Sequence, residues 1–130
     1  MGVMSDVCIV CQEPVFERFK EILADNCVPE ARIMVAKVGN DMPDVYMVLW
    51  YNIKWKREFD YVQKVSNFVR AECYRGCSDI GCGIEMIEIV DGMRRGDDCM
   101  SNNAEGMPDD FYIDMVIHKP NLKWKLRSLI

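Results

Sequence analysis

The order of strand-like and helix-like segments predicts an α+β fold of the ferredoxin-like class, a split βαβ arrangement in the order βαββαβ, with one additional C-terminal strand. Two observations support this prediction. Runs rich in β-branched and aromatic residues alternate with two amphipathic stretches of helical period along the 130 residues. No repeat, low-complexity tract or linker interrupts them, so residues 1–130 are expected to form a single domain. Right-handed crossovers would place both helices on one face of a mostly antiparallel sheet.

The first half of the chain predicts a strand, a helix and a pair of strands. Residues 7–10 form a short apolar run that fits a buried strand, and Pro14 stands where the first turn of a helix tolerates a missing N–H. Residues 32–38 and 45–55 are β-rich and flank a Gly-Asn-Asp turn signal, so we expect them to pair as a hairpin. The helix between the first strand and this hairpin is expected from apolar residues at helical spacing: Val15, Phe16, Phe19, Ile22 and Leu23.

The second half predicts another helix and further strands. Residues 58–71 have the period of an amphipathic helix, and residues 84–90 form the fourth predicted strand. Residues 91–110 are polar and aperiodic, which indicates a long loop, and residues 111–117 predict a last strand that can pair with the fourth at a sheet edge. The tail, residues 122–130, fits a strand by alternation and a short helix by its leucine spacing, so both alternatives stay open.

Composition and charge restrict the function. The formal net charge is −5 and the pI is about 4.9, which opposes direct binding of nucleic acid because such binding needs a basic face. An acidic surface can instead compete with nucleic acid for a basic protein. No apolar run approaches the roughly 20 residues of a membrane span, and the N-terminus lacks the features of a secretory signal. We therefore expect a cytoplasmic protein with reduced cysteines and no membrane partner.

The sequence gives little indication of a catalytic site. The chain has no P-loop, no dinucleotide fingerprint and no G-x-S-x-G nucleophile motif. His118 is the single histidine and ends a predicted strand, where we expect it to be solvated or to cap a neighbouring group. The sequence therefore predicts a protein that is not an enzyme and has no cofactor.

The cysteines offer an alternative interpretation. Cys73, Cys77 and Cys82 lie in the stretch CYRGCSDIGCG, and Cys99 follows further along the chain. Their spacing differs from the C-x2-C knuckle of most structural zinc sites, so we interpret the stretch as a helix-to-strand loop that carries reduced thiols. The alternative is a zinc-binding or thiol-redox domain that uses these four cysteines.

Side-chain alternation along the strands gives two further expectations. Cys8 and Cys11 should point to opposite faces of their strand. On the long strand at 45–55, one set points one way, namely Met47, Leu49, Tyr51, Ile53 and Trp55. The opposite set is Tyr46, Val48 and Trp50. Since helices would cover a single sheet face, one set should lie on the open face. It is then covered by tail residues Trp124, Leu126 and Leu129, or it forms a partner or homodimer surface.

The combined interpretation is a small acidic binding or regulatory protein that acts through contacts with another protein. An inhibitor of the phage or mobile-element type, which competes with nucleic acid for a basic partner, is one form of this hypothesis. The residues expected to contact the partner combine the aromatic strand with the acidic loop: Tyr46, Trp50, Asp91, Asp97, Asp98, Glu105, Asp109 and Asp110.

Overall fold

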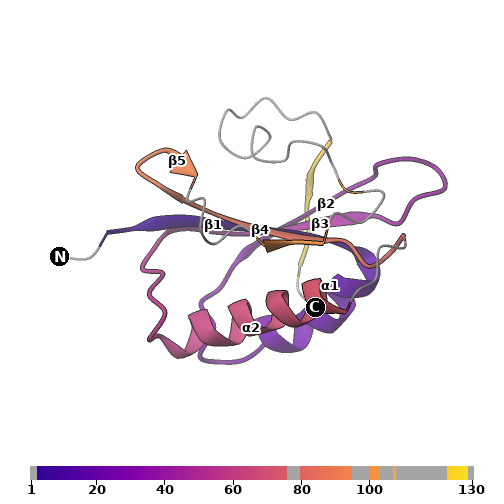
Figure 1. Ribbon diagram of the computed structural model, residues 1–130. Helices are drawn as coiled ribbons and strands as arrows, with labels where there is room; N and C mark the ends of the chain where they lie inside the picture. The colour runs from indigo at the N-terminus through magenta and orange to yellow at the C-terminus, as the bar shows by residue number, and fades with distance from the viewer. Residues whose placement is uncertain (1–2, 76–79, 95–99, 103–106, 108–122, 129–130) are drawn as a thin grey trace.

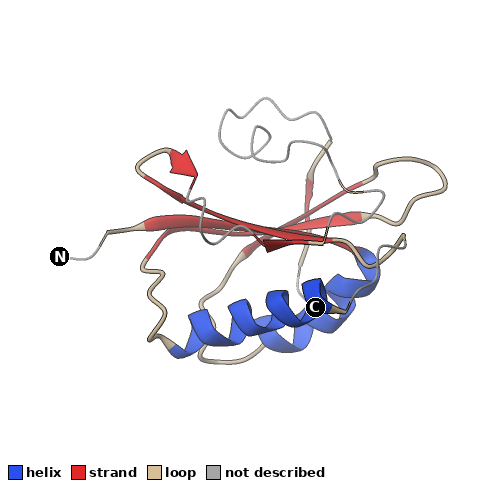
Figure 2. Ribbon diagram, in the orientation of Figure 1, coloured by secondary structure: helices blue, strands red, loops and turns tan. Residues whose placement is uncertain are grey.

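The computed structural model describes residues 3–75, 80–94, 100–102, 107 and 123–128. An antiparallel sheet forms one layer, and both long helices lie together beneath it (Figures 1 and 2). This arrangement confirms the predicted α+β class with both helices on one face. The long elements are β1 Ser5–Gln12, α1 Glu13–Leu23, β2 Arg32–Ala36, β3 Val45–Ile53, α2 Asp60–Tyr74 and β4 Ile84–Val90.

The four long strands lie in the order β4-β1-β3-β2, and every neighbouring pair is antiparallel. Each helix therefore joins two strands that have a third strand between them. Three two-residue strands extend the edges: β5 Met93–Arg94 and β6 Met100–Ser101 pair with β4, and β7 Lys125–Leu126 pairs with β2. Thus the tail forms a strand, on the edge opposite β4, while the predicted strand at 111–117 lies outside the described residues.

A tight hairpin joins β4 to β5 at Asp91-Gly92. Val90 pairs with Met93, so the turn has two residues, and both have positive φ, 51° and 75°. Two positive φ angles characterise the type I′ turn, for which Asp-Gly is a favoured sequence. The expectation of an irregular loop over 91–110 was therefore wrong at its start, although Asp-Gly was the available signal.

The main core lies between the sheet and the two helices. Phe16 of α1 stacks on Tyr46 of β3, with ring centroids 4.0 Å apart, and Phe19 stacks on Phe68 of α2 at 4.6 Å. The helices bury residues spaced three or four apart, which is why these sequences form amphipathic helices. Their buried apolar side chains are Val15, Phe16, Phe19 and Leu23 on α1, and Val62, Val65 and Val69 on α2.

An ion pair joins the two helices at the margin of this core. The Arg18 guanidinium donates two hydrogen bonds of 2.9 Å to the Glu72 carboxylate. The Glu72 side chain is only 7% exposed, and the Arg75 guanidinium also lies 3.8 Å from it. A buried carboxylate needs such partners because desolvation of an unpaired charge is unfavourable.

The opposite face of the sheet is also buried. A second apolar cluster comprises Cys8, Val10, Ala36, Val45, Met47, Leu49, Ile87 and Ile89, with Met107 and Trp124 packed against it. Cys11 belongs instead to the main core between the sheet and the helices, which confirms that Cys8 and Cys11 point to opposite faces. Trp124 confirms that the tail contributes to covering this face, whereas Leu126 is exposed. Buried side chains such as Met47 and Leu49 are therefore not available as a homodimer surface.

A β-bulge at Asn52 reverses the predicted facing at the end of β3. Val7 pairs with Trp50 but Ser5 pairs with Ile53, so β3 has one extra residue in this interval. Asn52 has a positive φ of 54°, and its N–H donates a hydrogen bond of 2.8 Å to Asp6 Oδ1. Because an extra residue shifts the alternation by one, Ile53 and Trp55 pack on the helix side. The expectation that they share a face with Met47 and Leu49 was wrong.

The conformation of Asn52 predicts an unequal effect of two substitutions. Glycine adopts positive φ freely, whereas alanine is strained there by about 1 kcal/mol or more. We expect Asn52→Ala to lower the free energy of unfolding by about 1 kcal/mol relative to Asn52→Gly, as measured by urea denaturation. Equal stability of the two variants would show that this backbone conformation is not maintained in solution.

Candidate functional site

The two aromatic residues predicted to contact a partner are part of the core. Tyr46 and Trp50 are 1% and 3% exposed and face the helices. The Tyr46 hydroxyl accepts a hydrogen bond of 3.0 Å from Arg127, and Trp50 Nε1 donates one of 2.9 Å to the carbonyl oxygen of Pro29. Both side chains are therefore already satisfied within the chain. The prediction that they form a contact surface fails because the helices cover this side of β3.

The acidic residues predicted to contact a partner are described only in part. Asp91 is exposed at the β4–β5 turn. The other five, Asp97, Asp98, Glu105, Asp109 and Asp110, lie outside the described residues, as does His118. The positions on either side of them show how this segment is attached to the sheet.

The chain that leads into β4 is held by Gln12, a fully buried side chain at the end of β1. Its Oε1 atom accepts hydrogen bonds from the backbone N–H groups of Gly81 and Gly83, at 2.7 and 2.8 Å. The backbone N–H of Gln12 donates to the Gly83 carbonyl oxygen at 2.9 Å. Gly81 has a φ of +102°, a conformation that glycine adopts without strain. Gln12 thus fixes the end of the cysteine stretch against the sheet.

Asn102 makes a second connection at the start of β4. Its Oδ1 atom accepts from the Ile84 N–H at 3.2 Å, its side-chain amide donates to the Cys82 carbonyl oxygen, and its N–H donates to the Ile84 carbonyl oxygen at 3.3 Å. The adjoining strand β6 pairs Ser101 with Glu85. Further along, the Met107 side chain packs against Gly83. A Cβ atom added at Gly83 would lie only 2.5 Å from the Met107 sulfur.

These contacts define a candidate contact region, residues 91–110, which we call the acidic edge. It is held to β4 and its surroundings at three described places: Met93–Arg94, residues 100–102 and Met107. The roles of Gln12, which holds Gly81 and Gly83, and of Asn102, which holds the start of β4, were not predicted from the sequence. The closely spaced glycines at 81 and 83 were the available signal, because backbone that packs closely needs a nearby acceptor for its N–H groups.

The cysteines do not all have the reduced state that the sequence predicts. Cys8, Cys11, Cys27 and Cys73 are free, but Cys82 is disulfide-bonded, and none of the four free cysteines is its partner. The expectation of three reduced thiols in the cysteine stretch is therefore wrong for Cys82. A sulfur in a disulfide is not a thiolate, which is the form that binds metal.

The described residues contain no cluster of three or more histidine, cysteine or acidic side chains that could hold a metal ion. Cys77 and Cys99 lie outside them, so the zinc alternative stays a prediction. Burial raises the pKa of Cys8 well above its ordinary value, with a contribution from Glu85. Burial also raises the pKa of Cys11, with a contribution from Glu72. Both thiols are thus neutral, which disfavours a thiolate redox pair.

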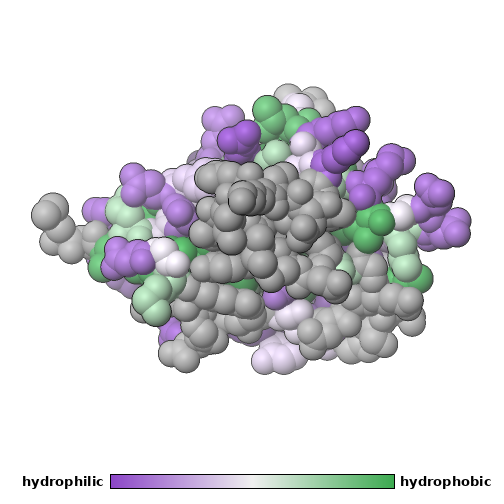
Figure 3. All heavy atoms as spheres, turned by 90° about the horizontal axis from the view of Figure 1, so that it is seen from above, coloured by the Kyte–Doolittle hydropathy of each residue, from purple (hydrophilic) through white to green (hydrophobic). Residues whose placement is uncertain are grey.

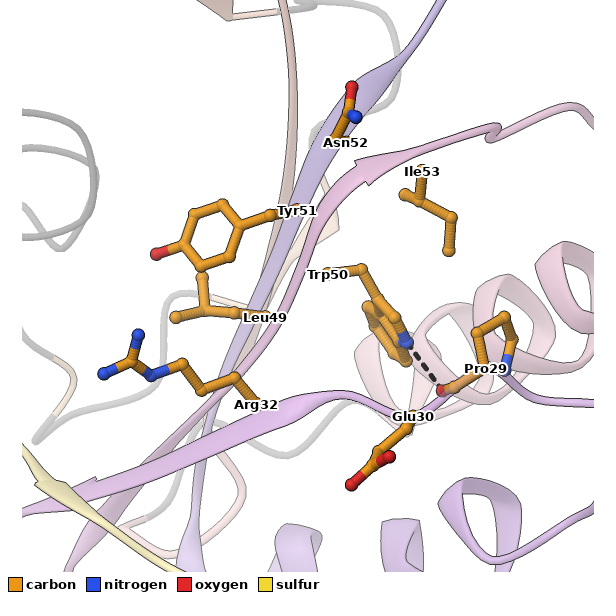
Figure 4. A pocket seen from close by; sticks show the side chains of 8 residues that line it. All are labelled: Pro29, Glu30, Arg32, Leu49, Trp50, Tyr51, Asn52 and Ile53. Atoms are coloured by element: carbon orange, nitrogen blue, oxygen red, sulfur yellow. Dashed lines mark hydrogen bonds between the residues drawn. The ribbon is translucent and has the colours of Figure 1, made fainter.

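A shallow hollow of about 320 Å³ lies where β2 begins and β3 continues past it (Figure 4). Arg32, Leu49 and Tyr51 line one side of it, and Pro29, Trp50 and Ile53 line the other. Burial raises the pKa of the Tyr51 hydroxyl, and the positive charge of Arg32 opposes that shift. This hollow was not predicted from the sequence.

The surface opposite the helices is mixed in character. Seen from that side, hydrophilic and hydrophobic groups alternate among the coloured atoms in view (Figure 3). Within the described part of the chain, no helix has the length and apolar composition needed to cross a membrane. Comparison with protein-family models, curated proteins and solved structures found no match to this chain.

The packing of Met107 on Gly83 predicts that an added methyl group destabilises the protein. A Cβ at Gly83 would lie 2.5 Å from Met107 Sδ and 2.9 Å from Gln12 Oε1, and the latter atom is held by two hydrogen bonds. We expect Gly83→Ala to lower the free energy of unfolding by about 1–3 kcal/mol. Gly39→Ala is the matched control, because the nearest atom to its Cβ is 4.0 Å away. Equal urea denaturation midpoints for the two variants would contradict this packing.

The cysteine environments predict an order of alkylation by iodoacetamide. Cys27 is exposed and should react first, Cys73 is half-buried and should react more slowly, and buried Cys8 and Cys11 should react only on unfolding. Cys82 should react only after a reductant is added, because it is disulfide-bonded. Peptide mass spectrometry with and without reductant measures this order, with unfolded, reduced protein as the control. Labelling of Cys82 without reductant would contradict the disulfide.

Proposed function

We propose that this protein is a non-catalytic acidic binding protein that uses the acidic edge to occupy a basic surface of another protein. The observation that carries the proposal is the location of its charge. Residues 91–110 contain six carboxylates and two arginines, a formal charge of −4 out of −5 for the whole chain. The remaining residues are thus nearly balanced in charge, and one segment accounts for the acidic character.

The attachment of this segment supports the proposal. Pairing of β5 and β6 with β4, and the contact of Met107 with Gly83, attach this segment to the rest of the fold at Met93–Arg94, at Met100–Ser101 and at Met107. A segment held at several points loses less conformational entropy on binding than a free tail of the same composition.

The class of partner follows from electrostatics. A concentrated negative potential accelerates association with a basic surface and opposes association with nucleic acid. The basic surfaces of nucleic-acid-binding proteins carry lysine and arginine for phosphate contacts. We therefore propose that the acidic edge competes with nucleic acid for such a surface, which would make the protein an inhibitor or regulator of its partner.

We also propose that the fold is the ferredoxin-like one. The strand order β4-β1-β3-β2 and the two crossing helices support this classification, with β5, β6 and β7 as additions at the edges. The proposed cytoplasmic location is supported by the four free cysteines and opposed by the disulfide at Cys82, because disulfides are rare in cytosolic proteins.

A charge-neutralised variant tests the proposed function. The variant D97N/D98N/D109N/D110N removes four charges from the acidic edge. The assay measures displacement of a labelled DNA duplex from a lysine-rich linker histone by the folded protein. We expect the wild type to displace the duplex and the variant to require at least about tenfold more protein. Displacement by the wild type should weaken as the salt concentration rises.

The matched control removes the same number of charges elsewhere. E21Q/E30Q/D41N/E58Q changes four exposed carboxylates outside the acidic edge, so both variants have the same net charge. We expect this control to displace the duplex nearly as well as the wild type. An equal loss in both variants would show that net charge alone acts, and absence of displacement by the wild type would reject the proposed competition.

A further inference from the structure

The sheet has a step at the end of β3, and this step forms the hollow. Pairing of β3 with β2 stops at Leu49, which lies opposite Arg32, whereas pairing of β3 with β1 continues to Ile53. Residues 50–53 of β3 therefore extend beyond β2 on one side. The chain that leads into β2 passes the step at Pro29, whose carbonyl oxygen is held by Trp50 Nε1 at 2.9 Å. The step is thus a fixed part of the fold.

Arg32 contributes an available cation to this hollow. Arg18 and Arg75 contact Glu72, Arg70 donates to Asn67 and Arg127 donates to Tyr46. Among the arginines whose side chains the structure describes, Arg32 alone is exposed without a hydrogen bond or ion pair. A guanidinium presents a planar set of donors that matches a carboxylate in a two-pronged geometry.

The groups beside Arg32 provide an apolar and aromatic surface. Leu49 lies directly opposite Arg32 across the strand pair and is only 3% exposed, and Tyr51 follows two residues later on the same strand. The three side chains point to the same side, with Leu49 between the other two (Figure 4). Glu30 also lines the hollow, but its carboxylate points away from the Arg32 guanidinium (Figure 4).

The bulge at Asn52 holds this surface in place. The Asn52 N–H donates to Asp6 Oδ1 at 2.8 Å, so the carboxylate of Asp6 is already engaged by the backbone next to Tyr51. Positive φ at a residue other than glycine is uncommon, and bulges often occur where a strand must redirect a side chain near a binding site. Tyr51 remains 46% exposed at this position.

We propose that the hollow binds an organic carboxylate that carries an aromatic or branched aliphatic group. The carboxylate pairs with the Arg32 guanidinium, and the apolar group rests on the exposed ring of Tyr51, next to Leu49. A volume of about 320 Å³ is at the lower end of the range for ligand pockets, which suits one such group. The ligand is a free acid or the C-terminal residue of a peptide, which present the same chemistry. This site is independent of the acidic edge.

Titration with defined probes, followed by amide chemical shifts in NMR spectra of the full chain, tests the proposal. N-acetyl-phenylalanine represents a peptide C-terminus, phenylacetate represents a free acid, and N-acetyl-phenylalanine amide lacks the negative charge. We expect saturable shifts around Arg32, Leu49 and Tyr51 with the acids at millimolar concentration, and at least about tenfold weaker binding of the amide. Shifts with N-acetyl-phenylalanine but not with phenylacetate would assign the site to peptide C-termini, and shifts with both would assign it to carboxylates in general.

Two variants separate the role of Arg32 from general effects. Arg32→Gln removes the charge from an exposed side chain, so the fold should persist, and we expect at least about tenfold weaker binding. Lys37→Gln removes an exposed cation just after β2 and should leave binding unchanged. Inorganic phosphate serves as a further probe. The proposal is overturned if neither acid causes shifts or if phosphate is the sole probe that does. It is also overturned if the amide binds as well as the acid, or if the two variants weaken binding equally.

Discussion

The structure depends on a central strand that is buried on both faces. β1 pairs with β3 on one side and β4 on the other, and Val7 to Cys11 have no exposed surface. Every residue in such a strand must be apolar or have its polar groups satisfied. The strand meets this requirement at both ends with long-range hydrogen bonds: the Ser5 hydroxyl donates to Glu88 at 2.5 Å, and Gln12 accepts from Gly81 and Gly83. Burial of β1 therefore determines where the end of the cysteine stretch is attached.

The periodicity of apolar residues predicted both helices and most of the side-chain facing in the strands. Spacing of apolar residues identified both helices, and strand alternation correctly separated Cys8 from Cys11. It failed for Ile53 and Trp55 because the bulge at Asn52 depends on a hydrogen bond to Asp6, 46 positions away in the sequence. Strand alternation also cannot show which face a helix covers, so Tyr46 and Trp50 were assigned to a contact surface although they belong to the core.

The candidate sites show the same division. The acidic character of residues 91–110 is evident from composition, but their attachment depends on pairing with β4 and on the contact of Met107 with Gly83, just before β4. The hollow is formed by the point at which one strand pairing stops and another continues, and no sequence pattern predicts that point. One site lies beside β4 and the other lies where β3 extends past β2, with β1 between β4 and β3.

The short strand β7 protects the β2 edge of the sheet. Lys125 and Leu126 pair with Val35 and Met34, the Arg127 N–H donates to the Ile33 carbonyl oxygen at 2.9 Å, and the Arg127 guanidinium lies 5.1 Å from the Tyr46 ring centroid. A strand of two residues between Lys123 and Arg127 offers little length for a further strand to pair with, and its charges oppose a close approach. Chains truncated before residue 123 would expose the β2 edge, which is apolar at Ile33, Met34 and Val35. Aggregation through sheet edges is the expected consequence, so the C-terminal residues contribute to solubility as well as to stability.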